Sequence, residues 1–543
     1  MGLFKEVKKP VIKTALAGTS EISPLRPLFV AKSPPCASNC PNGNQIRDLL
    51  VMIAQAKDYG LSTEQAFEQT WNRIVERNPF PAVTGRVCPH PCEEACNRKT
   101  KDGAVAFHAI ERMLGDFGIA KTLKLQRTAS ESRPEKVAVV GAGPAGLSCA
   151  YQLARRGYRV TIFESFPLPG GMLRYGIPES RLQRAILDAE INRVFELGIE
   201  LRCNCRVGTD VSLEQLRHEY QSVFVGTGAW QTIPLSVPGE DALNVTGALD
   251  FLRRFNGTEK IDIGKRAVIV GCGATAVDVA RASRRLGAEV TMVGAEVTAA
   301  DREIDAVRDE GVRIEVPAVP VAIRTEDGRA QRVRCVYLAT PEVDVPNALQ
   351  RSVPFEFDLE ASFVIVATNR EPDLRGFKAG CNGNGWFRTD DWGRAEAGLF
   401  AGGDNTGLGT VTQAIAQGRL AAETMDQQFQ GLEPEKPMSL PVITPDRIRL
   451  DRYQPAPRQL ETEAEEQRFA VHDADWSEEA IANEAKRCMS CGMCMDCETC
   501  WMYCSNNCFV RLPKGEHCRI KLELCNGCKK CAEACPTGYI ELV

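Results

Sequence analysis

The sequence predicts a multidomain α/β protein with cysteine-rich domains at both ends of the chain. Two stretches pass from a short β-branched run through a glycine-rich turn into a helix, which is how a nucleotide-binding βαβ unit begins. Cysteines precede the first stretch and follow the second, and twelve of the 23 lie beyond residue 487. At 543 residues the chain is too long for a single hydrophobic core, so three or four domains are expected.

Composition excludes several classes of protein. With 44% hydrophobic residues, 25% charged residues and a net charge of -5, the chain is typical of globular proteins and gives no reason to expect nucleic acid as a partner. No uninterrupted apolar run reaches about 18 residues, so no membrane span is predicted. Residues 1–10 lack the apolar stretch of a secretory signal, and 23 cysteines without such a signal suit a reducing compartment. We therefore expect a cytoplasmic protein.

The first nucleotide-binding unit begins with the strand-like run 137–140. Its turn contains Gly141, Gly143 and Gly146. The second of these glycines lets the backbone approach a pyrophosphate, and the third lets helix and strand pack closely. A second strand, 159–163, ends in Glu164, whose carboxylate lies about 20 residues after the glycines and can accept hydrogen bonds from a ribose.

The second unit repeats this pattern from residue 268. Its turn and first helical residues include Gly271, Gly273, Thr275 and Ala276, the last being a permitted small residue at the third glycine position. The paired strand, 289–293, is followed by Glu296. Because a carboxylate there favours a free ribose hydroxyl and repels a 2′-phosphate, NADH is expected in preference to NADPH.

A later glycine-rich segment indicates which dinucleotide each unit binds. A short run ending in Gly403 and Asp404 can set a carboxylate on flavin ribitol, and a helix beginning near Thr410 can direct its N-terminal N–H groups at the flavin. The first Rossmann-like fold is therefore expected to bind FAD and to enclose an inserted NAD fold. The predicted FAD domain spans 133–250 and 370–430, and the NAD domain spans 251–369.

The C-terminal region, 484–543, is predicted to be a ferredoxin-like α+β domain with two 4Fe-4S clusters. It contains two C-x-x-C-x-x-C-x-x-x-C runs, in which the fourth cysteine ligates the opposite cluster. The expected ligand sets are Cys494, Cys497, Cys500 and Cys535 for one cluster, and Cys525, Cys528, Cys531 and Cys504 for the other. Zinc knuckles and disulfides are the alternatives, but neither is expected to give two full runs in tandem.

Between these domains, residues 431–483 are rich in proline and charge. Such a segment cannot build its own core, so we expect an extended linker that runs across the flavin domain.

Three further motifs carry a family resemblance that covers residues 34–430. They are 80–89 (FPAVTGRVCP), 170–178 (GGMLRYGIP) and 238–240 (PGE). The chain resembles the small subunit of bacterial glutamate synthase and its family of FAD and iron–sulfur NAD(P)H oxidoreductases. The resemblance adds Gly171 and Arg174 to the flavin-binding candidates. It also implies a helical iron–sulfur domain over 1–132.

In that N-terminal domain the resemblance implies one 4Fe-4S cluster, held by Cys40, Cys88, Cys92 and Glu111. The family's outer cluster needs an upstream C-x-x-C that is missing here, which leaves Cys36 and Cys96 without partners. Four cysteines of the C-terminal region also have no assigned role. Cys488 and Cys491 form an extra C-x-x-C for structural use or an undetermined ligand role, and Cys508 and Cys518 stand alone.

The expected function is electron transfer between NAD(H), FAD and 4Fe-4S clusters, in a direction that the sequence does not determine. Flavin is needed because nicotinamide exchanges two electrons together, whereas a cubane accepts one. No side-chain acid or base is required, so no catalytic residue is expected. The expected partner is a ferredoxin, or the other subunits of a hetero-oligomeric redox complex such as a 2-oxoacid or CoA-ester oxidoreductase. The alternatives are a glutamate synthase small subunit that uses NADPH and a non-enzymatic iron–sulfur redox sensor or scaffold.

Overall fold

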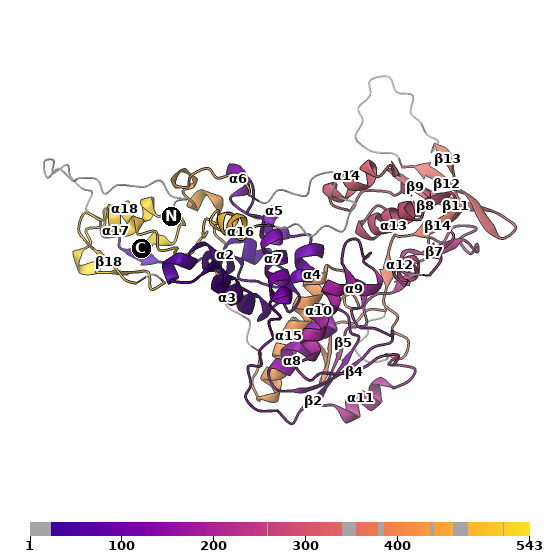
Figure 1. Cartoon of the computed structure of the whole chain (residues 1–543), viewed down its shortest axis with the longest axis horizontal. Helices are drawn as coiled ribbons and strands as arrows, with labels where there is room; N and C mark the ends of the chain where they lie inside the picture. The colour runs from indigo at the N-terminus through magenta and orange to yellow at the C-terminus, as the bar shows by residue number, and fades with distance from the viewer. Residues whose placement is uncertain are drawn as a thin grey trace, which may run out of the picture.

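The computed structural model describes residues 23–257, 259–338, 355–377, 385–434, 439–459, 476–513 and 515–543, apart from the side chain of Arg302. The parts form an elongated molecule (Figure 1). The C-terminal cysteine-rich domain and the second nucleotide-binding fold lie at opposite ends, and the N-terminal helices and the first fold lie between them. None of the described helices is long and apolar enough to cross a bilayer.

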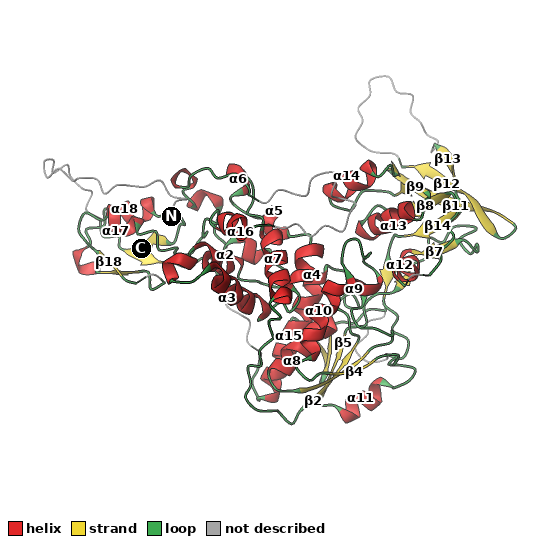
Figure 2. Cartoon of the chain, in the orientation of Figure 1, coloured by secondary structure: helices red, strands yellow, loops and turns green. Residues whose placement is uncertain are grey.

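The N-terminal domain is helical, as Figure 2 shows. Its helices are α1 (Pro35–Ser38), α2 (Ile46–Ala54), α3 (Thr63–Val75), α4 (Pro81–Val87), α5 (Pro91–Glu94), α6 (Lys99–Asp102) and α7 (Phe107–Ala120). Helix α3 begins at a capping box in which Ser62 and Gln65 satisfy each other's backbone N–H groups. It buries Phe67 and Trp71 on the face toward α7, and this packing holds the short cysteine-bearing helices in place.

The first nucleotide-binding fold is a six-stranded sheet in the order β16-β17-β5-β2-β3-β4. Its strands are β2 (Lys136–Val140), β3 (Arg159–Phe163), β4 (Glu200–Arg202), β5 (Ser222–Val225), β16 (Arg394–Glu396) and β17 (Leu399–Ala401). The last two come from beyond the inserted fold, and β17 pairs in parallel with β5. The sheet of the first fold therefore combines strands from before and after the inserted fold, as the predicted nesting requires.

Helices cover this sheet and position its glycine-rich turn. They are α8 (Pro144–Arg155), α9 (Met172–Tyr175), α10 (Arg184–Phe195), α11 (Leu213–Glu219) and α15 (Val411–Phe429). A Cβ atom on Gly146 would lie 1.9 Å from the carbonyl oxygen of Gly141, so only glycine lets α8 start this close to the turn. Helix α15 packs along α8 in the same way, because a Cβ on Gly418 would lie 2.0 Å from the carbonyl oxygen of Ala145.

The second fold is a five-stranded parallel sheet in the order β10-β9-β8-β14-β7. It contains β7 (Val245–Gly247), β8 (Arg266–Val270), β9 (Glu289–Val293), β10 (Arg313–Glu315) and β14 (Phe363–Val366), with helices α12 (Ala248–Asn256), α13 (Ala274–Arg285) and α14 (Asp301–Asp309). An antiparallel sheet of β11 (Ala318–Glu326), β12 (Arg329–Tyr337) and β13 (Glu356–Glu360) lies beside it. Strand β7 precedes the boundary expected at residue 251. The linking strands β6 (Gln231–Thr232) and β15 (Arg370–Glu371) pair with each other where the chain leaves and re-enters the first fold.

The C-terminal domain contains α16 (Glu478–Ala485), α17 (Thr499–Tyr503), β18 (Phe509–Arg511), β19 (Cys518–Ile520), α18 (Lys530–Ala534) and β20 (Ile540–Leu542). One strand comes from the other end of the chain, since β1 (Pro27–Phe29) pairs antiparallel with β20. The described residues before α1, within the region 1–132 predicted as the helical domain, therefore add a strand to the C-terminal domain.

The proline-rich segment also differs from its prediction. Residues 435–438 and 460–475 lie outside the described residues, as does Cys381. The described part, 439–459, does not cross the flavin domain. It packs between the two cysteine-rich domains, where Ile443, Ile448 and Tyr453 form a small core with Met489. A composition rich in proline and charge predicted that the segment has no core of its own. Its few large apolar side chains instead form a core together with Met489 of the C-terminal region.

The contact between α8 and α15 gives a test of the fold. We expect Gly418→Ala to lower the free energy of unfolding by about 1–3 kcal/mol and to reduce FAD retention, because the added methyl group has no room against backbone atoms. Thermal unfolding and bound-flavin absorbance measure both effects. Gly407→Ala is the control, since an added Cβ there would meet nothing within 4 Å. Equal stability of the two variants would contradict this packing.

Candidate functional site

A pocket of about 550 Å³ lies where the two nucleotide-binding folds meet. Its wall combines residues of both folds with two residues of the N-terminal helical domain. From the predicted cofactor-binding residues it includes Gly141, Gly143, Glu164, Gly171, Gly403, Asp404, Thr410 and Thr275. This volume is within the range of cofactor sites, and the lining is contributed by segments far apart in the sequence.

On the first fold, the carboxylate of Glu164 is held at the end of β3 by backbone donors. The N–H of Ala142 donates to Oε2 at 2.7 Å, and the N–H of Phe166 donates to Oε1 at 2.9 Å. Burial raises the pKa of this carboxyl group. Gly171 completes this side of the pocket with φ of 51°, and a Cβ there would lie 2.7 Å from the Cα of Gly143. Both residues lie where a dinucleotide ribose and pyrophosphate would bind.

The opposite wall is made by the N-terminal turn of α15. Thr410 caps this helix, since its hydroxyl accepts the N–H of Gln413 at 3.2 Å. Asp404 lies just before it and accepts the N–H of Gly409 at 3.2 Å. The helix thus presents its positive end, with Thr410 and Val411, to the pocket. This arrangement can stabilise negative charge on a bound flavin.

Arg174 lies next to Gly171, and its backbone N–H donates to the carbonyl oxygen of Gly171 at 3.0 Å, but its side chain turns to other partners. It does not line the pocket, and its guanidinium instead pairs with Asp188 and donates to the carbonyl oxygen of Pro169 at 2.5 Å. The structure therefore gives this arginine a visible role in holding α9 against α10.

On the second fold, Thr275 reaches the pocket, whereas the glycine turn lies at the end of β8, outside the lining. Gly271 and Gly273 connect β8 to α13, and Ala276 lies in the first turn of α13. Glu296 follows β9 and is exposed, which is where an adenosine ribose would approach a βαβ unit. Of the predicted nicotinamide-binding residues, Thr275 therefore lines the pocket, whereas Glu296 lies on the exposed surface after β9.

Two arginines that the sequence did not single out join the two folds at the pocket. Arg370, on β15, pairs with Asp404 at 2.7 Å, and it donates to the hydroxyl of Thr275 at 3.4 Å. Arg181, near α9, pairs with Asp278 at 3.1 Å and with Glu303 at 3.1 Å. No motif marks these residues, because each acts only once the two folds are placed together.

The N-terminal residues predicted as cluster ligands lie together beside this pocket. Burial, followed by the charge of Glu111, raises the pKa of the Cys88 thiol to about 12. Burial and then the charge of Cys40 raise the pKa of Cys92 as well. Glu111 is itself buried and accepts a hydrogen bond from the Asn78 amide at 3.1 Å. His90 Nε2 lies 3.6 Å from the other carboxylate oxygen of Glu111. Three thiols and a carboxylate gathered in the interior suit a bound cation or cluster.

Cys88 connects this set to the flavin pocket. Its neighbours Val87 and Pro89 line the pocket, and its sulfur accepts a hydrogen bond from the Thr412 hydroxyl at 3.2 Å. Thr412 lies in the first turn of α15, beside Thr410 and Val411. The predicted cluster ligand and the pocket therefore share one helical turn as their common wall.

The C-terminal cysteines also gather as the two runs predict. Among the causes that raise the pKa of Cys497 is the charge of Cys535, and among those that raise the pKa of Cys531 to about 12 is the charge of Cys504. Burial is the largest cause in both. The fourth cysteine of each run therefore lies beside the other run. Cys508 and Cys518 lie next to these sets, since the backbone N–H of Cys508 donates to the sulfur of Cys504 at 3.2 Å, and Cys518 raises the pKa of Cys500.

Two nested dinucleotide folds around one pocket, with cysteine sets beside them, define a flavoprotein of the pyridine-nucleotide-dependent class joined to iron–sulfur domains. Residues 135–418 match the pyridine nucleotide-disulphide oxidoreductase family. Residues 22–123 match the 4Fe-4S domain II of dihydropyrimidine dehydrogenase, and residues 519–541 match a 4Fe-4S binding domain.

Curated relatives agree with this class. The chain is 35% identical to the NADPH-Fe(3+) oxidoreductase subunit beta of Geobacter sulfurreducens, over 63% of this chain and 51% of that protein. It is 32% identical to the NAD-dependent dihydropyrimidine dehydrogenase subunit PreT of Salmonella typhimurium, over 67% and 86%. It is 30% identical to the glutamate synthase [NADPH] small chain of Mycobacterium tuberculosis, over 75% and 89%. The chain thus spans about half the length of the Geobacter protein and most of the other two.

The chain belongs to the pyridine nucleotide-disulphide oxidoreductase family, among relatives of the glutamate synthase small chain. As a member of this family it is an oxidoreductase, and its sequence matches FAD and NAD(P) binding folds and 4Fe-4S domains toward both ends of the chain. The predicted fold class and the prediction of an enzyme are confirmed. The alternative of a sensor or scaffold without activity is thereby disfavoured.

We expect Glu164→Ala to weaken FAD binding by about tenfold to a hundredfold, because a charge-assisted hydrogen bond contributes about 1.5–3 kcal/mol. FAD titration of the flavin-depleted full chain measures this change. Glu219→Ala is the control, since Glu219 is an exposed residue at the end of α11, away from the pocket. Equal dissociation constants for the two variants would remove Glu164 from the site.

Proposed function

We propose that this chain transfers electrons between NADH and a partner redox protein through FAD and a series of 4Fe-4S clusters. The observation that carries the proposal is the single pocket shared by both folds, with Cys88 directly behind its wall. Flavin, when bound, supplies the exchange between a two-electron hydride donor and one-electron carriers. The position of the pocket supports entry of electrons from one side and their exit through the N-terminal cysteines on the other.

In this proposal the side chains bind, orient and exclude water, and none acts as an acid or base. Glu164 holds a ribose of FAD, and Asp404 and the start of α15 hold the ribitol and the flavin ring. Arg370 and Arg181 keep the second fold against the first, so that Thr275 faces the pocket. Cys40, Cys88, Cys92 and Glu111 hold the cluster nearest to the flavin. The two C-terminal runs hold the remaining pair of clusters.

We also propose NADH as the preferred nicotinamide, on the basis of Glu296. This exposed carboxylate follows β9, where a 2′-phosphate would meet it. Relatives with either nicotinamide in their names match this chain, so the preference depends on the residues of this site and not on the comparison.

Glu296→Arg should therefore raise kcat/KM for NADPH relative to NADH by about tenfold or more, because it replaces like-charge repulsion of a phosphate with attraction. Anaerobic steady-state reduction of a viologen dye with each nicotinamide gives the ratio. Glu326→Arg, on the exposed end of β11, is the charge-matched control and should leave the ratio unchanged. An unchanged ratio in the Glu296 variant would refute its assigned role.

For the partner we propose a ferredoxin or the remaining subunits of a larger redox complex, in either direction of transfer. The C-terminal domain with two cysteine runs supports this choice over a glutamate synthase small subunit. The relative from Geobacter is itself a subunit beta by name.

The experiment that tests the function is reduction of the anaerobically purified full chain by NADH. We expect bleaching of the flavin absorbance, then loss of the broad cluster absorbance, and dye reduction that Asp404→Ala diminishes. A flavin that neither NADH nor NADPH bleaches would contradict the proposal. Copurification from the native host identifies the partner.

A further inference from the structure

Four cysteines without an assigned role come together in the structure. Cys36 and Cys96, left over in the helical domain, line one pocket with Cys488 and Cys491 from the leader of the C-terminal domain. All four are free thiols. Burial, and then the charges of Cys488, Cys491 and Cys96, raise the pKa of Cys36. The volume of the pocket, about 30 Å³, exceeds what one water molecule needs, so the sulfurs surround a space.

The Cys488–Cys491 turn has the local geometry of the predicted cluster-binding runs. The residue two positions after Cys488 is Ser490, with φ of 51°, and its N–H donates to the Cys488 sulfur at 3.5 Å. In the first C-terminal run, Asp496 has φ of 53°, and its backbone N–H donates to the Cys494 sulfur at 3.5 Å. Left-handed serine and aspartate are uncommon and strained, and N–H donors to sulfur are what cluster thiolates use. This C-x-x-C is therefore folded as a ligand loop.

A buried amide also faces the thiols of this pocket. Asn97 lines it and is only 8% exposed, and a hydrogen bond from its side chain to Cys491 opposes the rise in the pKa of that thiol that burial causes. N–H donors to sulfur are what cluster thiolates use, so Asn97 is placed to support an ionised Cys491.

The spacing of the sulfurs disfavours a single metal ion. In a tetrahedral zinc site, with Zn–S distances near 2.3 Å, the four sulfurs lie about 3.8 Å apart. Within the described ranges, the one group of three or more possible ligands whose atoms all lie within 4.8 Å of one another is Cys494, Asp496 and His517. No three of the four pocket thiols lie within 4.8 Å of one another, whereas a zinc site would bring all four that close.

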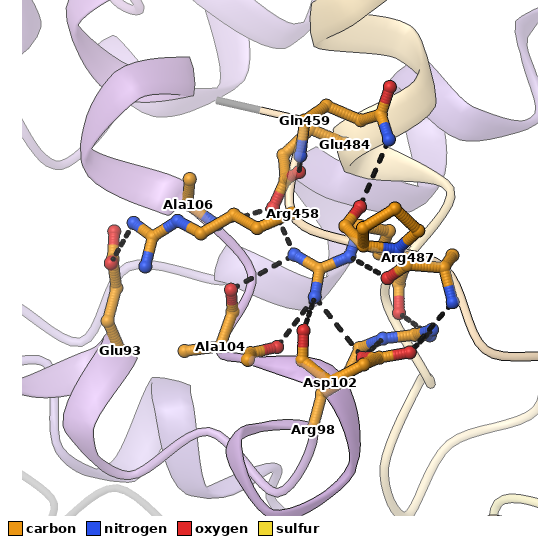
Figure 3. A network of polar contacts seen from close by, with 12 residues as sticks. Glu93, Arg98, Asp102, Ala104, Ala106, Arg458, Gln459, Glu484 and Arg487 are labelled. Carbon is orange, nitrogen blue, oxygen red and sulfur yellow. Dashed lines mark hydrogen bonds and ion pairs between the residues drawn. The ribbon is translucent and has the colours of Figure 1, made fainter. Parts of the chain in front are cut away.

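A buried polar network fixes the leader beside Cys96. Arg487, adjacent to Cys488, lies at its centre (Figure 3). Its guanidinium pairs with Glu484 at 2.5 Å and with Asp102 at 3.2 Å, and it donates to the carbonyl oxygens of Asp102, Ala104 and Ala456. Arg98, two residues after Cys96, donates to the carbonyl oxygen of Arg487 at 2.6 Å and pairs with Asp102. The segments that carry Cys96 and Cys488 are thus anchored by the same contacts.

The other carboxylate of this network is also fully satisfied. Glu484 accepts the backbone N–H of Ala106 at 2.8 Å and that of Gln459 at 2.7 Å, and both donors appear in Figure 3. Buried charges are tolerated only when they are paired in this way. The contact between the leader of the C-terminal domain and the helical domain is therefore a specific, buried polar interface.

We propose that Cys36, Cys96, Cys488 and Cys491 together hold an additional 4Fe-4S cluster, shared between the two ends of the chain. The C-terminal leader supplies the C-x-x-C that is missing upstream of Cys36. Only the role of this cluster as an electron carrier rests on the proposed function. Binding of the cluster by the four cysteines does not depend on it.

The proposed site lies between the cysteines nearest the flavin and the two C-terminal cysteine runs. Cys92, from the set nearest the flavin, also lines the pocket. On the other side, Tyr453 is buried between the pocket and the C-terminal runs, since the charges of Cys491 and Cys497, after burial, raise the pKa of its hydroxyl. The shared cluster would therefore lie between the flavin-side cluster and the C-terminal pair.

The test is metal content of the anaerobically reconstituted full chain. We expect about sixteen irons and as many sulfides per wild-type chain, and about twelve in the Cys488→Ser/Cys491→Ser variant, with FAD content and flavin reduction by NADH unchanged. The matched control, Cys203→Ala/Cys335→Ala, changes two cysteines outside every set and should keep about sixteen. About twelve irons in the wild type, an unchanged count in the first variant, or stoichiometric zinc would overturn the proposal.

Alkylation of the wild-type chain gives a second test that does not depend on folding of a variant. With iron bound, the four thiols should resist iodoacetamide, and anaerobic chelation of iron should make all four reactive together. Cys149, buried in the first fold, should stay protected in both states, which separates ligation from burial. Modification of Cys488 or Cys491 in the iron-replete chain, or continued protection of all four after chelation, would overturn the proposal. Failure of NADH to reduce the flavin would instead contradict the proposed function and leave these results intact.

Discussion

The short segment between α4 and α6 is the constraint on which the rest of the site depends. Its three cysteines, Cys88, Cys92 and Cys96, reach in turn the flavin pocket, the set beside it and the C-terminal leader. The helix that precedes it, α4, is fixed at its start by the buried carboxylate of Glu190, which accepts the N–H groups of Ala82 and Val83 at 3.0 Å. The C-terminal end of the segment is fixed by the Arg98 ion pair. A shift of this segment would move all three cysteines together.

Burying these cysteines destabilises their thiolate form, so an ionised set needs a compensating positive charge. Burial is the first cause of the raised pKa of Cys36, Cys88 and Cys92, and neighbouring thiolates or carboxylates raise each of them further. Without a cation such a group would remain protonated, whereas coordination to iron keeps thiolates ionised. Cluster binding would therefore supply charge compensation for these buried thiolates.

Short-range patterns in the sequence were enough for the nucleotide folds and their nesting. The β-branched runs before Gly141 and Gly271 became β2 and β8, and Asp404 and Thr410 reached the pocket wall. What could not be predicted is long-range pairing. Strand β1 joining β20, and Cys488 meeting Cys36, involve segments from opposite ends of the chain with no shared periodicity. Arg370 and Arg181 were missed for the same reason, since Arg370 reaches Thr275 and Arg181 reaches Asp278 only across the contact between the two folds.

The shared site changes what the segment before the C-terminal domain does. A flexible linker would leave that domain at a range of distances from the flavin, and transfer would depend on how often it approached. Here residues 439–459 pack between the two domains, β1 adds a strand, and the Arg487 network closes the junction. Metal coordinated from both sides would add its binding free energy to the same interface, because a site split between domains forms only when they are joined. Loss of that cluster would therefore weaken the attachment of the C-terminal domain as well as interrupt the sequence of carriers.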